Sequence, residues 1–162
     1  MQLSPSILLT SGLALMQMSS AAPAPIDALS KRTVYNLPPS TQFVTCPSYL
    51  YSSLQVNRAI QRGIILTPKE QPQPGDYPHV FGNNRNLPFH EECKGKTLYE
   101  FPILHGDAIY GGGEPGADRV VFYIYTNNPD TNPTDDGAYC GVMTHDGAPR
   151  DRFALCPVRD RF

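Results

Sequence analysis

Four ionisable side chains, each in or beside a different apolar stretch, could together perform acid–base chemistry on a phosphate ester. They are His79 in YPHVF, Glu100 in LYEFPIL, Arg119 in ADRVVF and His145 in GVMTHDGA. Glu100 can accept a proton, His145 can donate one, and Arg119 can hold an anion through its planar fork of donors. Tyr77 and His79 can supply further hydrogen bonds.

This set of groups suits the cleavage of RNA by the ribose hydroxyl that neighbours each phosphate. A base removes the 2'-hydroxyl proton, a cation stabilises the anionic phosphorane, and an acid protonates the leaving 5'-oxygen. Each proton-transfer partner typically contributes about 10²–10⁴ in rate. Taken singly, the residues have plainer interpretations: His145 as a surface histidine, Glu100 as a buried paired carboxylate, and Arg119 as the ion-pair partner of Asp118.

The stretches that carry these residues have the pattern of β-strands. Each is rich in Val, Ile, Tyr or Phe, and turn clusters such as YGGGEPGAD and TNNPDTNPTDDG separate them. The stretch DRVVFYIYT is apolar on both faces, which predicts the central strand of a sheet. The predicted strands are Tyr77 to Phe81, Leu98 to Leu104, Asp118 to Thr126, Ala138 to His145 and a short one over Arg152 to Cys156.

One short amphipathic helix is predicted over residues 53–62. Serine is a good N-cap at its start, an apolar stripe follows, and Gly63 is a good stop signal. Residues 33–45 are Pro-rich and polar, which predicts an extended arm, and residues 67–76 have the composition of a loop. One helix ahead of several strands with hairpin-like connections indicates an α+β fold with an antiparallel sheet.

The first 32 residues have the features of targeting and processing segments. The apolar run ILLTSGLALMQM precedes small residues, which predicts a signal peptide over residues 1–21. Residues 22–32 end in the dibasic pair Lys31-Arg32, which predicts a pro-segment cleaved after Arg32 and a mature domain over residues 33–162. The alternative is that this pair is a solvated part of an uncleaved tail.

Composition limits the class of protein. A chain of 162 residues suits one domain, and its formal charge of -2 excludes a strongly basic nucleic-acid coat or a polybasic membrane binder. Removal of residues 1–32 takes away Asp27, Lys31 and Arg32 and leaves a charge of -3. No segment after the apolar run is long enough to span a bilayer, which needs about 20 apolar residues.

All the cysteines lie in the predicted mature domain. An even number of cysteines in a small exported domain predicts two disulfides, and spacing alone leaves three pairings open. A metal site is disfavoured because no pair has C-x-x-C spacing and no HExxH-like cluster exists. The cysteines are Cys46, Cys93, Cys140 and Cys156.

Four blocks, YPHVF, LYEFPIL, YGGGEPGADRVVF and GVMTHDGAPRDRF, resemble in the same order the blocks of the small secreted fungal guanyl- or purine-preferring ribonucleases. The resemblance covers about Cys46 to Cys156, and it is specific because four ordered blocks agree. It implies a helix packed on a twisted antiparallel sheet. It also implies an endoribonuclease that cleaves single-stranded RNA to 2',3'-cyclic phosphates and then hydrolyses them to 3'-phosphates.

The resemblance assigns roles to the candidate catalytic residues. Glu100 resembles the general base, His145 the general acid and Arg119 the phosphate-binding cation. Phe153, eight residues after His145, matches an aromatic ring beside the phosphate. The remaining matches are phosphate contacts of the first strand, Tyr77 and His79, of which His79 could assist or replace the base.

The segment after YPH resembles the loop that reads the guanine edge. Phe81 can stack on a base, whereas Asn83 and Asn84 are also typical of plain turn chemistry. The expected base-binding residues are Phe81, Gly82, Asn83, Asn84 and, six residues after His145, Asp151.

Base preference is less well defined by the pattern, because the family's acidic residue is replaced here by Arg85. Arginine can donate to O6 and N7 of guanine but cannot accept from N1–H and N2–H. Glu91 or Glu92 could substitute if the loop folds back. We therefore expect a preference for guanine, or for purines in general.

The resemblance also implies the disulfides Cys46–Cys156 and Cys93–Cys140, the second as in the purine-preferring branch and in ribotoxins. We expect no cofactor, no metal ion and no membrane association. The expected protein is a secreted, extracellular monomer whose partner is single-stranded RNA.

Two other functions share these features. A ribotoxin would cleave one ribosomal RNA loop, but ribotoxins are basic and carry a long Lys-rich loop, whereas His79 and Glu100 are only 21 positions apart here. A non-catalytic effector could use the same scaffold to bind RNA or protein, although none of the matched catalytic residues is lost. An active ribonuclease that is also cytotoxic remains compatible with the sequence.

Overall fold

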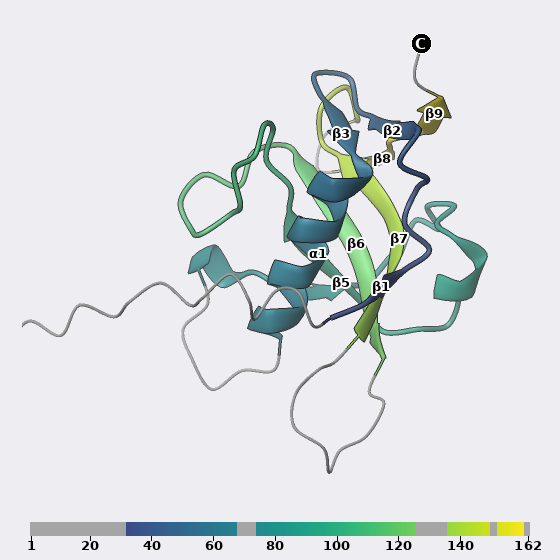
Figure 1. Cartoon of the computed structure of the whole chain (residues 1–162), viewed down its shortest axis with the longest axis vertical. Coiled ribbons are helices and arrows are strands. Elements are labelled where there is room, and N and C mark those ends of the chain that lie inside the picture. The colour runs from purple at the N-terminus through teal and green to yellow at the C-terminus, as the bar shows by residue number, and fades with distance from the viewer. Residues whose placement is uncertain (1–31, 68–73, 126–135, 150–151, 161–162) are drawn as a thin grey trace, which may run out of the picture.

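The structure, a computed structural model, describes residues 32–67, 74–125, 136–149 and 152–160. Within them the helix α1 (Ser53–Leu66) packs against a six-stranded sheet (Figure 1). The strands of this sheet are β1 (Val34–Tyr35), β4 (His79–Phe81), β5 (Leu98–Pro102), β6 (Asp118–Tyr125), β7 (Asp136–Thr144) and β8 (Ala154–Leu155).

The larger sheet has the order β1-β7-β6-β5-β4, and β8 pairs with β7. All its strand pairs are antiparallel except β1 with β7. The α+β prediction is therefore confirmed. The prediction of a central strand is also confirmed, because β6 has a neighbour on each side and its first six residues are buried.

The helix begins as predicted but ends later. Ser52 is the N-cap, and its side chain and that of Gln55 form a capping box. The helix continues through Gly63 to Leu66, so the prediction of Gly63 as a stop signal was wrong. A Cβ on Gly63 would lie 2.6 Å from the ring of Phe122 on β6, which shows that glycine is required there for close packing of helix on sheet.

Four of the predicted strands begin or end elsewhere. Strand β7 begins two residues before the predicted Ala138 and ends one residue before His145, and β8 is shorter than the predicted 152–156. Tyr77 precedes β4 instead of lying in it, and it is joined to Pro78 by a cis peptide bond. Proline has no N–H for a strand ladder, so the strand begins only at His79. At the other end of the next strand, β5 stops at Pro102, two residues before the predicted Leu104.

The segment over residues 33–45 is not the extended arm that its composition predicted. It contains β1 and β2 (Gln42–Thr45), and β2 lies between β3 (Leu50–Ser52) and β9 (Val158–Asp160) in a second, three-stranded sheet. These strands are too short for alternation to be visible in the sequence. Strand β9 was likewise not predicted.

The core has one layer on each face of the larger sheet. Toward α1 the sheet presents Phe101, Val120, Phe122 and Val142, and on the opposite face Leu98, Val121, Cys140 and Met143. Side chains alternate along a strand, so Glu100, between Tyr99 and Phe101 of the α1 side, belongs to the face opposite the helix.

Both implied disulfides are confirmed. Cys46–Cys156 joins the chain after β2 to the chain between β8 and β9, and Cys93–Cys140 joins a short 3₁₀ turn (Glu91–Cys93) to β7. All four cysteines are buried. Within the described residues no helix is long and apolar enough to cross a membrane.

Candidate active site

His79 and Glu100 face each other across two neighbouring strands. They are direct partners in the register of β4 and β5, and His79 Nδ1 lies 3.3 Å from Glu100 Oε1. The His79 side chain is 46% exposed, whereas that of Glu100 is 8% exposed. The pair therefore joins a solvent-accessible imidazole to a buried carboxyl group.

The environment of Glu100 destabilises its ionised form. Burial raises the pKa of this carboxyl group, and the charges of His79, Arg119 and His145 lower it by a smaller amount. Oε2 is buried and has no hydrogen-bond partner among the described residues. A carboxyl group in such a site is a stronger base than an exposed one, since removal of its charge is favoured.

Arg119 lies on β6, opposite Pro102 of β5, and its side chain is fixed by several hydrogen bonds. Nε donates to the Tyr77 hydroxyl at 3.0 Å. Nη1 donates to the backbone carbonyls of Pro115, Gly116 and Asp118 at 2.9–3.1 Å. The guanidinium is thus held in place by the loop that precedes β6, and none of these acceptors neutralises its charge.

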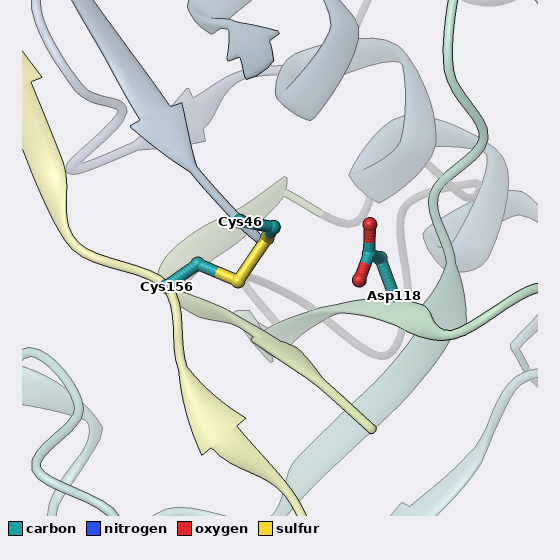
Figure 2. A group of neighbouring side chains, drawn as sticks. All are labelled: Cys46, Asp118 and Cys156. Atoms are coloured by element: carbon teal, nitrogen blue, oxygen red, sulfur yellow. A yellow bond between two sulfur atoms is a disulfide. The ribbon is translucent and has the colours of Figure 1, made fainter. Parts of the chain in front are cut away.

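The interpretation of Arg119 as the ion-pair partner of Asp118 is not supported, since the described residues show no such ion pair. The Asp118 carboxylate instead accepts a hydrogen bond of 2.6 Å from the Tyr51 hydroxyl. It lies beside the Cys46–Cys156 disulfide (Figure 2), with the sulfur and carboxylate atoms within 4.8 Å of one another. Both sulfurs are in the disulfide bond, so this group offers a metal ion no thiolate.

Tyr77 connects the histidine to the arginine. Its ring stacks on His79, with centroids 4.7 Å apart and an interplanar angle of 26°, and Arg119 Cζ lies 5.1 Å from its centre. The edge of Tyr110 packs against the same ring. We call Tyr77, His79, Glu100 and Arg119 the catalytic cluster, after the role that the sequence predicts for them.

His145 follows β7 and is exposed. Its Nδ1 is 2.7 Å from the carbonyl oxygen of Arg152, and its ring packs on Phe153 with centroids 3.7 Å apart. Since the carbonyl can only accept, Nδ1 carries the proton, and Nε2 is the ring nitrogen left for proton transfer. The sequence gives no signal for the Arg152 carbonyl, because every residue carries such a group.

A pocket of about 200 Å³ opens beside Phe153, and its lining includes the four predicted base-binding residues that the structure describes. The rings of Phe81 and Phe153 meet edge to face at 5.9 Å. Asp151 lies outside the described residues. We call this the base pocket, after the predicted base-binding residues in its lining. It is lined by Phe81, Gly82, Asn83, Asn84, Arg85, Leu87, Arg152 and Phe153.

Two observations refine the expectations for this loop. The Asn83 side chain donates to the carbonyl and accepts from the amide of Leu87, so it has the turn-forming role that its residue type allowed. Glu92 accepts a hydrogen bond of 2.6 Å from Asn36, and Glu91 borders a different pocket. Neither glutamate is among the residues that line the base pocket, so the condition for one of them to replace the missing acid, that the loop folds back onto the pocket, is not met in this structure.

Comparison with known proteins gives the family. A model of the ribonuclease family matches residues 39–157. The chain is 38% identical over 113 residues to guanyl-specific ribonuclease U1 of Ustilago sphaerogena, covering 70% of this chain and 93% of the relative. The chain belongs to the fungal guanyl-specific ribonucleases. It is also 38% identical over 112 residues to guanyl-specific ribonuclease Pc of Penicillium chrysogenum, covering 69% of this chain and 95% of the relative.

A further ribonuclease aligns over a larger part of this chain. Guanyl-specific ribonuclease N1 of Neurospora crassa is 28% identical over 163 residues and covers 92% of this chain and 97% of the relative. The family match includes every residue of the catalytic cluster and of the base pocket.

Proposed function

We propose that this protein is a secreted endoribonuclease that cleaves single-stranded RNA on the 3' side of guanine. The observation that carries the proposal is the pairing of His79 with buried Glu100. The charges of Arg119 and His145 also lower the pKa of the same carboxyl group. Three relatives named guanyl-specific ribonucleases support the base preference. Two buried disulfides are typical of exported proteins.

The first step is a transesterification. Glu100, with His79 at 3.3 Å, takes the proton of the 2'-hydroxyl, whose oxygen attacks the adjacent phosphorus. Arg119 stabilises the charge that develops on the phosphoryl oxygens. His145 Nε2 gives a proton to the leaving 5'-oxygen, so the bond from phosphorus to that oxygen breaks and a 2',3'-cyclic phosphate remains.

The second step reverses the proton transfers. His145, now neutral, takes a proton from water, and the water oxygen attacks the cyclic phosphate. Protonated Glu100 returns its proton to the 2'-oxygen as that bond to phosphorus breaks. The product is a 3'-phosphate, and both residues regain their starting states.

The base pocket reads guanine through donors. Arg85 and Arg152 are among the residues that line it, and no Asp or Glu lines its described part. Guanine presents two acceptors, O6 and N7, to such donors, whereas adenine presents an N6 donor in place of O6. The rings of Phe81 and Phe153 supply apolar walls for the base.

A dinucleotide assay tests this function. Guanylyl-uridine should yield guanosine 2',3'-cyclic phosphate between pH 5 and 8, faster than adenylyl-uridine yields its counterpart. His145→Ala should remove this activity, while His90→Ala, a histidine that borders the other pocket, should retain it. Intact guanylyl-uridine after incubation with correctly disulfide-bonded protein would overturn the proposal.

A further inference from the structure

The start of β1 is fixed to the start of β7 by two hydrogen bonds around Thr33. The amide N–H of Thr33 donates to Asp136 Oδ1 at 2.7 Å. The amide of Gly137 donates to the carbonyl oxygen of Thr33 at 3.0 Å. One carboxylate and one backbone amide therefore bind both polar groups of the Thr33 backbone.

Thr33 is also the residue that follows the dibasic pair Lys31-Arg32. We propose that cleavage after Arg32 makes Thr33 the amino terminus of the mature protein, and that Asp136 binds the new α-ammonium group. The reaction is hydrolysis by a protease that cuts after paired basic residues. Water adds across the Arg32–Thr33 peptide bond, so Arg32 leaves with a carboxylate and Thr33 gains the ammonium group.

The contact already present in the uncleaved chain places the nitrogen correctly. Cleavage changes the donor at 2.7 Å from a neutral amide to a cation, and hydrogen bonds between charged partners are the stronger kind. Asp136 makes no ion pair within the described part of the chain, so its charge is available for this one. Loss of Arg32 also removes the contact from Gln61 Nε2 to the Arg32 carbonyl oxygen at 3.2 Å.

The effect on folding should be modest, since the contact is exposed. Exposed ion pairs change a folding equilibrium constant by about twofold to fivefold. The contact lies at the beginning of β7, the strand that ends just before His145. Processing would thus add an ion pair between the mature amino terminus and β7, the strand that leads to His145. This conclusion does not depend on ribonuclease activity.

The test begins with the full-length chain secreted from a eukaryotic host that has such a protease. Amino-terminal sequencing should find Thr33 first. Urea unfolding is then compared for mature and uncleaved protein, each with Asp136 and with Asp136→Asn. Uncleaved protein comes from Arg32→Ala, and Glu91→Gln serves as the control for loss of one negative charge.

The expected result is that Asp136→Asn lowers the folding constant of the mature form about twofold to fivefold more than that of the uncleaved form. Selective acetylation of the α-amine, which removes the charge and leaves Asp136 intact, should produce a similar loss. An amino terminus other than Thr33 would overturn the proposal. So would equal effects of Asp136→Asn on the two forms, or acetylation without effect.

Discussion

His145 links the catalytic cluster to the base pocket, since its charge acts on Glu100 and its ring packs on Phe153, yet the two regions are built differently. Glu100 and Arg119 lie on paired strands and are only 6% and 4% exposed. Apart from Phe81 at the end of β4, the base pocket is formed by loop residues, and Arg85 and Arg152 are exposed. Strand register thus fixes the groups that act on the phosphate, whereas the loop can change its side chains without disturbing the sheet.

The difference explains how Arg85 can occupy the position at which the resemblance predicts an acidic residue. An exposed loop position makes no ladder hydrogen bond and fills no core space, so a change of charge there alters recognition more than stability. A change at Glu100 should instead lower the rate for every substrate and leave base preference unchanged, since every substrate presents the same 2'-hydroxyl and phosphate. Variants of the two regions can therefore be separated by their effects.

The largest effect is expected from loss of the acid. His145→Ala should lower kcat/KM by about 10²–10⁴, because the variant lacks the proposed general acid. The factor should be the same for guanylyl-uridine and for inosylyl-uridine, measured by initial rates. A loss confined to one of these substrates would mean that His145 reads the base.

A smaller effect should come from reversing the charge in the base pocket. Inosine keeps O6 and N7 but lacks the 2-amino group, so a pocket that reads through donors should cleave guanosine and inosine substrates at similar rates. Arg85→Glu supplies an acceptor for N1–H and N2–H and should raise the guanosine-to-inosine ratio about tenfold.

Arg159→Glu, on β9, makes the same change of charge outside the pocket and should leave that ratio unchanged. If the unaltered protein already discriminates strongly against inosine, an acceptor is present in the pocket and the donor-only interpretation is wrong.

Replacement of Glu100 in the catalytic cluster should lower activity but raise stability. Because burial raises the pKa of Glu100, its ionised form costs folding free energy, and Oε2 has no hydrogen-bond partner among the described residues. Glu100→Gln should therefore stabilise the protein at pH 7 by about 1 kcal/mol while removing activity. Arg85→Glu should change stability by less than about 0.5 kcal/mol, as usual for a surface position.

Urea unfolding at several pH values checks the cause. The penalty is absent below the ordinary pKa of the carboxyl group, 4.5, grows as pH rises toward the raised folded value, and is complete above it. The advantage of Glu100→Gln should follow the same course and disappear in acid. An advantage of equal size at every pH would point to packing instead of charge.

The smallest effect concerns the pH profile of kcat/KM. Glu100 must be ionised and His145 protonated, which gives a bell shape. Since the pKa of Glu100 is raised, the acid limb should lie above the ordinary glutamate range, and Arg85→Glu should leave that limb in place. An acid limb at the ordinary value would indicate that another group acts as the base.

Much of the architecture was predictable from local pattern. The serine N-cap and the apolar strand over 118–125 each depend on residues close together in the chain, and the prediction of two disulfides needs only the count of cysteines. The resemblance then supplied the disulfide pairing and the candidate residues. The helix end was mispredicted, because a glycine that ends helices in isolation serves here to let α1 approach Phe122.

The sequence by itself determined which residue types are available: a carboxyl group, two imidazoles and a guanidinium on successive apolar stretches. Only the tertiary structure decided that His79 and Glu100 are register partners, that the Arg152 carbonyl orients His145, and that Asp136 reaches Thr33. The physical reason is that spacing along a chain sets which face a side chain occupies. Contacts between residues far apart depend on how strands pair, and backbone groups that make such contacts are the same in every residue type.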